Sequence, residues 1–178
     1  MAVTPVQKTS GMNSFRLLGL VALIALGVIA TAWAYEILGG LKPCPLCLTQ
    51  RWAYYFSIPA IALILLAFHD LRQGPGALLL TFVTLAFAAN AVLAAYHSGV
   101  EWHWWMGPTA CTGGGEAADL QTAAGGLLES IESTRVVRCD EASWRFLGLS
   151  FAGWNVIISL VLAAACLRVL MREFRTND

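Results

Sequence analysis

The apolar run LLGLVALIALGVIATAWAYEIL, residues 17–38, decides the class of protein to which this chain belongs. A helix of about 20 apolar residues is long enough to cross the roughly 30 Å hydrocarbon core of a bilayer. The run follows Lys8 and Arg16, as the apolar part of a secretory signal peptide would, but it is longer than the roughly 7–15 residues typical of such a segment. We therefore expect a first membrane helix that the protein retains.

Three further apolar runs follow, and they are WAYYFSIPAIALILLAF at 52–68, ALLLTFVTLAFAANAVLAAYH at 77–97 and LSFAGWNVIISLVLAAACLRVLM at 149–171. Of the 178 residues, 58% are hydrophobic and 12% are charged, whereas soluble domains are about half apolar and about a quarter charged. The sequence predicts an all-α membrane protein, with one domain over residues 1–178 in which four transmembrane helices form a bundle. The formal net charge of zero gives no basic field that would favour binding to nucleic acid.

The distribution of basic residues predicts the orientation of these helices, because cytoplasmic loops carry an excess of Lys and Arg. If the N-terminus is inside, the inner segments hold six basic and three acidic residues, and the outer segments hold five basic and eight acidic residues. We therefore expect both termini in the cytoplasm, with outer loops near residues 39–51 and 98–148.

Four of the five cysteines fall on these two outer loops, where an oxidising environment permits disulfides. Cys44 and Cys47 form a Cys-x-x-Cys pair in the first loop, within KPCPLCLTQRW at 42–52, and Cys111 and Cys139 lie in the second. A Cys-x-x-Cys pair indicates a redox-active dithiol, a zinc site or a structural staple. Two pairs on the same side of a membrane favour exchange between them.

Each of these three interpretations makes its own demand on the residues. Thiol–disulfide exchange needs a thiolate and a resolving cysteine, and a helix that starts near Cys47 would favour the thiolate there. Arg51, one turn later, would stabilise this thiolate, hold a carbonyl oxygen of a bound oxidant, or anchor the helix at the membrane interface. A zinc site could combine the cysteines with His97 and His103. Staples alone would each stabilise the fold by about 2–4 kcal/mol.

Four short motifs, taken in order, resemble those of the disulfide bond formation protein B (DsbB) family. They are KPCPLCLTQRW at 42–52, YHSGVEW at 96–102, GPTAC at 107–111 and RCDEASWRFLGLSFAGWN at 138–155. The resemblance extends over about residues 15–172. It implies a four-helix thiol oxidase of the bacterial inner membrane, with its active cysteines facing the periplasm.

The resemblance also implies a route for electrons through the two cysteine pairs. A periplasmic thioredoxin-like dithiol carrier, DsbA in that family, would form a mixed disulfide with Cys111, whose partner is Cys139. Cys139 would then attack Cys44, giving a transient disulfide between the loops and freeing the Cys47 thiolate. The carrier would leave oxidised and ready to introduce disulfides into other proteins.

In the same family the electrons end on a membrane quinone. The resemblance places Cys47 facing the quinone ring, Arg51 beside it and His97 near it, without indicating whether the quinone is ubiquinone or menaquinone. Two other functions compete with this one. A membrane scaffold would use its outer cysteines only as structural disulfides, and a reductase that exports electrons would need a reductant at the inner face, where only Cys166 is available.

Other residues give narrower expectations. Cys166 lies in the fourth apolar run, where we expect it to serve as a small hydrophobic side chain. Asn90 and Asn155 lie in the third and fourth runs, and we expect them to form hydrogen bonds across helices. The segment DLQTAAGGLLESIES, residues 119–133, has leucine and isoleucine at helical spacing and predicts a short amphipathic helix on the outer surface.

Overall fold

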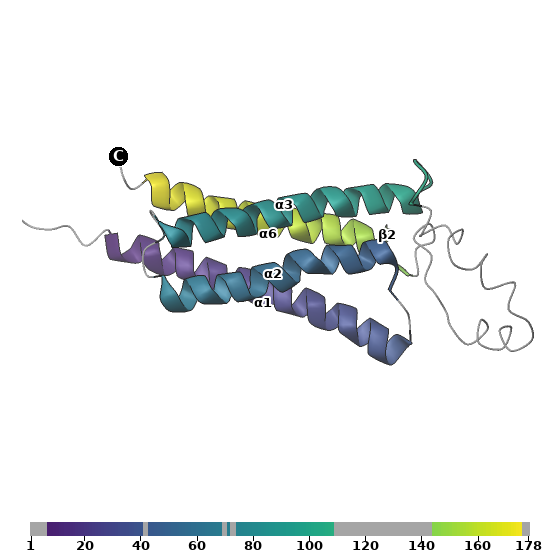
Figure 1. Cartoon of the computed structure of the whole chain (residues 1–178), viewed down its shortest axis with the longest axis horizontal. Helices are drawn as coiled ribbons and strands as arrows, with labels where there is room; N and C mark the ends of the chain where they lie inside the picture. The colour runs from purple at the N-terminus through teal and green to yellow at the C-terminus, as the bar shows by residue number, and fades with distance from the viewer. Residues whose placement is uncertain (1–6, 41–42, 69–70, 72–73, 109–143, 176–178) are drawn as a thin grey trace, which may run out of the picture.

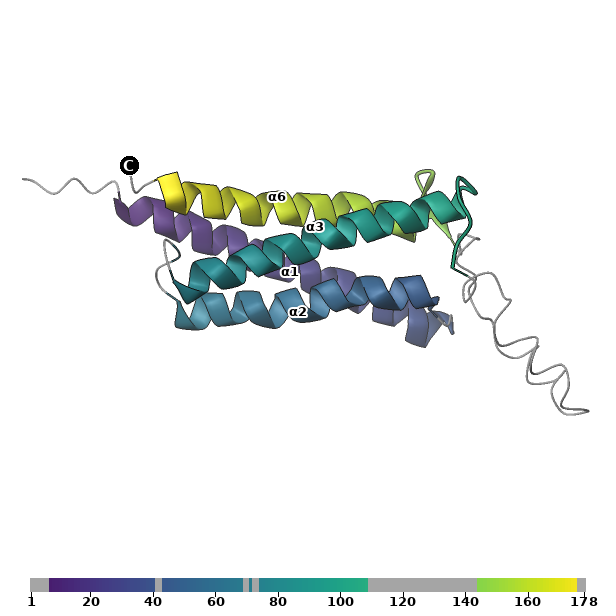
Figure 2. The same cartoon turned by 45° about the horizontal axis from the view of Figure 1, so that its top comes forward.

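Four α-helices make up most of the structure, which describes residues 7–40, 43–68, 71, 74–108 and 144–175. The helices are α1 (Gln7–Gly39), α2 (Pro45–Ala67), α3 (Pro75–Glu101) and α6 (Phe151–Arg175). In this computed structural model they lie side by side as a bundle, in which α1 and α3 each contact both α2 and α6 (Figure 1, Figure 2). The start of α1 and the end of α6 lie at one end of the bundle, and the start of α2 and the end of α3 lie at the other.

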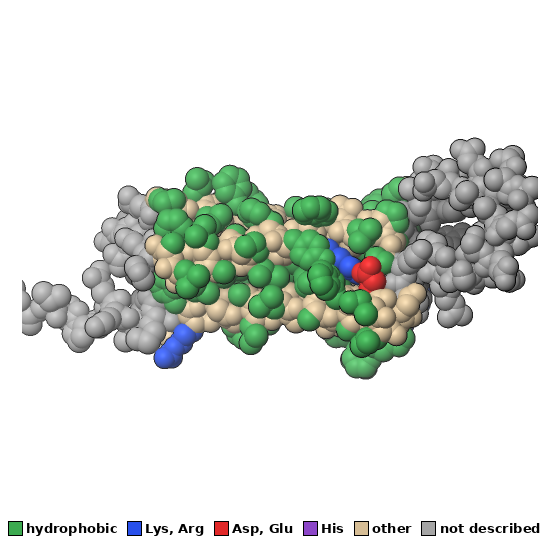
Figure 3. All heavy atoms as spheres, turned by 60° about the horizontal axis from the view of Figure 1, so that its bottom comes forward, with side chains coloured by type: hydrophobic (Ala, Val, Ile, Leu, Met, Phe, Trp, Pro, Cys, Tyr) green, Lys and Arg blue, Asp and Glu red, His purple; other side chains and the backbone are tan. Residues whose placement is uncertain are grey.

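Three of the described helices are long and apolar enough to cross a membrane. They are α1 over Asn13–Gly39, α3 and α6. Large hydrophobic side chains stay exposed on the outside of the bundle, among them Leu23, Phe82 and Leu160, and hydrophobic side chains cover most of the face shown in Figure 3. A surface of this kind would be unfavourable in water but suits contact with lipid. The predicted membrane-embedded helical protein is confirmed at this level.

The observed helices differ from the predicted apolar runs mostly at their starts, since α1 begins at Gln7 instead of residue 17 and α2 begins at Pro45 instead of residue 52. The start of α2 at Pro45 agrees with the helix start near Cys47 that was expected to favour a thiolate there. The first loop is therefore much shorter than the predicted 39–51. Proline suits the first position of a helix because its missing N–H would have no partner within the helix. Cys44 directly before it is the N-cap residue. The Cys-x-x-Cys segment is therefore the start of a helix, as predicted from the chemistry of the pair, and only the loop bounds 39–51 taken from the apolar run were wrong.

The predicted count of four membrane spans stays a prediction. The 23 residues of α2 form a helix about 35 Å long, which is enough to cross the hydrocarbon core. It is nevertheless not among the three helices that also satisfy the criterion of apolar composition. Gln50 and Arg51 in its second turn lower the hydropathy of its first half.

A short hairpin precedes α6, so the described chain is not entirely helical. Strands β1 (Arg145–Phe146) and β2 (Leu149–Ser150) pair antiparallel, with Arg145 opposite Ser150. Leu147 and Gly148 between them both have positive φ, as a two-residue hairpin turn requires. The predicted amphipathic helix at 119–133 lies outside the described residues.

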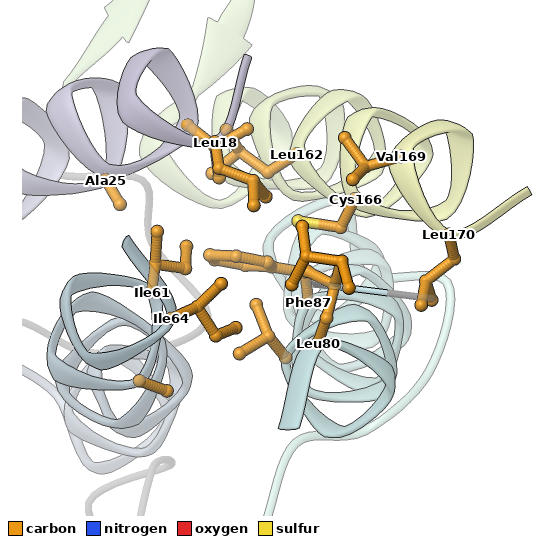
Figure 4. Packing of buried hydrophobic residues seen from close by; sticks show 14 of the residues in the cluster. Leu18, Ala25, Ile61, Ile64, Leu80, Phe87, Leu162, Cys166, Val169 and Leu170 are labelled. Atoms are coloured by element: carbon orange, nitrogen blue, oxygen red, sulfur yellow. The ribbon is translucent and has the colours of Figure 1, made fainter. Parts of the chain in front are cut away.

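The core of the bundle is made of side chains from all four helices. Figure 4 shows them converging, with Leu18 from α1, Ile61 from α2, Phe87 from α3 and Leu162 from α6 pointing toward one another. Cys166 is fully buried in this core. Its predicted place as a small hydrophobic side chain is therefore confirmed.

Polar side chains connect the helices above this core. Asn90 donates from Nδ2 to Ser159 Oγ at 2.9 Å, which joins α3 to α6. Asn155 donates from Nδ2 to Gln50 Oε1 and accepts at Oδ1 from the Tyr54 hydroxyl, which joins α6 to α2. The predicted hydrogen bonds of Asn90 and Asn155 across helices are confirmed.

We predict that Phe87→Ala lowers the free energy of unfolding by about 3–5 kcal/mol, because it removes a fully buried ring from the core. Phe82→Ala on the same helix is the matched control, since its ring is 52% exposed. Unfolding with sodium dodecyl sulfate in mixed micelles, followed by circular dichroism, measures both variants. Equal losses for the two variants would contradict the packing described for α3.

Candidate active site

A cavity of about 670 Å³ opens at the end of the bundle where α2 begins. Apolar side chains such as Ile24, Val28 and Ile158 line its walls. Cys44, Cys47, Gln50, Arg51, His97 and Glu101 line the same cavity with polar groups. A volume of this order is typical of sites for small organic ligands, which combine apolar walls with a few polar groups.

The two cysteines of the first pair are held in contact by the start of α2. The Cys44 Sγ atom accepts a hydrogen bond from the Cys47 backbone N–H at 3.2 Å, which caps the helix. The same sulfur donates to Cys47 Sγ at 2.7 Å. A disulfide bond is about 2.05 Å long, so a small side-chain movement is enough to join the pair. Cys44 is buried, whereas Cys47 is half-buried.

The proton of the pair is held by Cys44. Its hydrogen bond to Cys47, together with burial, raises the pKa of the Cys44 thiol to about 12. Cys47 is the sulfur that accepts this bond. The partial positive charge at the start of α2 favours negative charge at the same place. Cys47 is thus the better placed of the two to carry electrons to a ligand in the cavity.

Arg51 is fixed by an acidic partner on another helix. Its Nη1 donates to Glu36 Oε2 of α1 at 2.6 Å, and the Arg51 side chain is 13% exposed. Both residues line the cavity with Cys47. Glu36 therefore holds the Arg51 guanidinium, which has further N–H donors, at the wall of the cavity that Cys47 also lines.

The orientation of His97 follows from a directed set of hydrogen bonds. Gln50 Oε1 already accepts from Asn155, so the Gln50 amide nitrogen is the donor to His97 Nδ1 at 2.9 Å. A neutral His97 then carries its proton on Nε2. This nitrogen lies 3.8 Å from Cys44 Sγ and 4.0 Å from Glu101 Oε1. The imidazole opposes the rise in the pKa of Cys44, because its N–H stabilises the thiolate form.

Glu101 is buried behind His97 and is fixed from the other side. Ser150 donates from Oγ to Glu101 Oε2, and the same Oγ accepts from the Gly153 backbone N–H at 3.2 Å. The hairpin before α6 therefore holds the carboxylate that lies beside the histidine.

The structure brings together four of the six predicted site residues, namely Cys44, Cys47, Arg51 and His97. Cys111 and Cys139 lie outside the described residues. Sequence reasoning missed Glu36, Gln50 and Ser150 as parts of the site. Glu36 carried a usable signal, since an ionisable residue in an apolar run indicates function. The roles of Gln50 and Ser150 follow only from their contacts with residues of other elements.

Part of the zinc hypothesis also gains a geometric basis. Ligand atoms of Cys44, Cys47 and His97 lie within 4.8 Å of one another, so these three residues could hold a metal ion. Structural zinc sites use four protein ligands. His103 is exposed and does not belong to this group.

Comparison with known proteins gives a consistent result over nearly the whole chain. The sequence model of the family described as "Disulfide bond formation protein DsbB" matches residues 14–169. Disulfide bond formation protein B of Marinobacter nauticus is 31% identical over 169 residues, which cover 94% of this chain and 98% of that protein. The protein of the same name from Xanthomonas campestris pv. campestris is 32% identical over 174 residues, which cover 85% of this chain and 90% of that protein.

We predict that Cys47→Ala increases the alkylation rate of Cys44 at pH 8 by about tenfold or more. The substitution removes the main cause of the raised pKa, and each unit of decrease gives about ten times more thiolate at this pH. The measurement is iodoacetamide labelling of anaerobic, reduced protein, with each cysteine-containing peptide quantified by mass spectrometry. Cys166 in the core serves as an internal control whose rate should not change. An unchanged alkylation rate of Cys44 would show that the hydrogen bond to Cys47 does not raise the pKa of the Cys44 thiol.

Proposed function

The chain belongs to the disulfide bond formation protein B family and is a disulfide oxidoreductase, and on that premise we propose that it passes electrons from a periplasmic dithiol carrier to a membrane quinone. The observation that carries this proposal is the shared cavity. Cys47 and Arg51 line one largely apolar space next to the helix start that holds the cysteine pair.

The proposal includes an orientation in the bacterial inner membrane. All four helices would cross the bilayer, with both termini in the cytoplasm and the cysteine pair at the periplasmic edge. This is supported by Arg16, Arg168 and Arg172, which lie at the end opposite the pair, because basic residues accumulate on the cytoplasmic side. It is also supported by the position of the start of α1 and the end of α6 at that same end.

The proposed electron route uses both cysteine pairs. The reduced carrier, a thioredoxin-like protein similar to DsbA, attacks the Cys111–Cys139 disulfide and forms a mixed disulfide with Cys111. The freed Cys139 attacks Cys44 of the Cys44–Cys47 disulfide, and Cys47 leaves as the thiolate. The other thiolate of the same carrier then attacks the carrier sulfur of the mixed disulfide, so that Cys111 leaves as the thiolate and the carrier departs with its own disulfide. Two electrons have entered the protein, and the protons of the carrier dithiol are released.

The chemistry of the cavity fits a quinone, which would supply an acceptor for two electrons and two protons. The apolar walls suit the ring and its hydrocarbon tail. Arg51, oriented by Glu36, offers N–H donors to a carbonyl oxygen and stabilises negative charge that develops there. Cys47 lines the same cavity and would pass the electrons to the ring.

His97 would act on the buried cysteine. Its Nε2–H faces Cys44 Sγ, so it stabilises the Cys44 thiolate whenever a disulfide at Cys44 opens. The hydrogen bond from the Gln50 amide to His97 Nδ1 keeps the imidazole proton on Nε2, facing Cys44.

We predict that the purified protein in detergent reduces quinone only when a reduced thioredoxin-like carrier is present. Cys47→Ala and Cys111→Ala should each abolish this reduction, because each removes one step of the route. Cys166→Ala is the matched control and should keep the activity, since Cys166 lies in the core away from the cavity. Absorbance of the quinone gives the rate.

The oxidase proposal would be abandoned if folded, oxidised protein reduced neither ubiquinone nor menaquinone. Outer disulfides that do not exchange with the carrier would instead indicate a membrane scaffold. Bound metal, lost from Cys44→Ser and His97→Ala, would indicate the zinc site.

We predict that Arg51→Gln raises the KM for quinone by about tenfold or more, the effect of losing a hydrogen bond from a charged donor. Arg145→Gln is the control, because Arg145 stacks over the Trp102 ring and is not part of the cavity wall. Steady-state kinetics at saturating carrier separate KM from kcat. A KM that stays the same in Arg51→Gln would place the quinone elsewhere.

A further inference from the structure

A second cavity, of about 550 Å³, lies between α1 and α6 at the end of the bundle opposite the cysteine pair. Its charged lining consists of Arg16 from α1 and Arg168 and Arg172 from α6. The two helices are joined beside it by a hydrogen bond of 2.8 Å from Ser14 Oγ to Glu173 Oε1. The two sides of this arginine groove are therefore held at a fixed spacing.

The positive charge of the arginine groove is not neutralised within the described part of the chain. All three arginines are exposed, and none of them takes part in an ion pair among the described residues. The nearest acidic side chain in sequence, Glu173, is buried and accepts the bond from Ser14. It does not belong to the groove lining. Among the described residues, the groove thus presents three cations without an ion-pair partner.

The other half of the groove is apolar. Leu17 and Leu20 follow Arg16 into the membrane span of α1, and Ala164 and Ala165 lie one turn deeper along α6 than Arg168. The alanine side chains are small and leave room beside the leucines. The lining therefore changes from guanidinium groups at the end of the bundle to hydrocarbon further in.

We propose that this groove binds an anionic phospholipid of the surrounding membrane. The guanidinium groups bind the phosphate and the net negative headgroup, and an acyl chain lies along Leu17, Leu20 and Ala164. Arginine is suited to phosphate because its planar group donates two parallel hydrogen bonds. Basic pockets between membrane helices are a known mode of headgroup recognition. The apolar lining favours a lipid over free phosphate, and the three cations favour an anionic lipid over a zwitterionic one.

The proposal uses the end of the bundle remote from the cysteines, so it does not depend on the proposed oxidase function. Native mass spectrometry of the full chain, released from detergent micelles, measures bound lipid directly. We expect phosphatidylglycerol to bind about tenfold more tightly than phosphatidylcholine. Excess inorganic phosphate should not displace it.

Matched variants locate the site. Arg168→Gln and Arg175→Gln each remove one positive charge from α6, but only Arg168 lines the groove. We expect about tenfold weaker phosphatidylglycerol binding in Arg168→Gln and unchanged binding in Arg175→Gln. Ala164→Phe keeps every charge and fills the apolar half, so it should also weaken binding. Circular dichroism confirms that each variant is folded.

Three results would overturn the proposal. Equal binding of the two lipids would show that the groove does not select for charge. Equal affinities in Arg168→Gln and Arg175→Gln would place any selective binding elsewhere. Displacement by inorganic phosphate, with no effect of Ala164→Phe, would show a site for a free anion.

Discussion

The hydrogen bond from the Cys47 backbone N–H to the Cys44 sulfur is the interaction on which the rest of the site depends. It sets the first residue of α2 and places both sulfur atoms at the positive end of that helix. Because an α-helix has 3.6 residues per turn, the same start fixes Gln50 and Arg51 one turn beyond Cys47. A helix that began at residue 52, as the apolar pattern suggested, would leave all four side chains on an unconstrained loop.

That single turn of α2 is tied to each of the other three helices. Arg51 binds Glu36 of α1, while Gln50 binds His97 of α3 and accepts from Asn155 of α6. Polar groups buried in a bundle are costly unless they are hydrogen-bonded. Here each of these side chains has a partner, so the polar network joins the starts of α2 and α6 to the last turns of α1 and α3. The cavity is the space left beside this network, with its shape set by four helices at once.

The sequence allowed the membrane helices, the cysteine pair and Arg51 to be predicted, because each is a local pattern of a few to about twenty residues. Hydropathy alone placed the start of α2 too late, at residue 52, because Cys-Pro-Leu-Cys is not part of the apolar run. The chemistry of the cysteine pair placed it correctly near Cys47. The partners of Gln50 and Glu36 could not have been assigned, since they lie 47 and 15 residues away in the chain. Their contacts exist only after the helices have packed.

The polar first two turns of α2 and the presence of the site are two aspects of the same arrangement. A helix that carries a redox pair, an amide and a guanidinium in its first two turns loses apolar character in that half. It compensates through partners on α1, α3 and α6, and its second half enters the core with Ile61 and Ile64. Polar and ionisable side chains that are buried and partnered within a membrane bundle thus mark the place where the bundle does its chemistry.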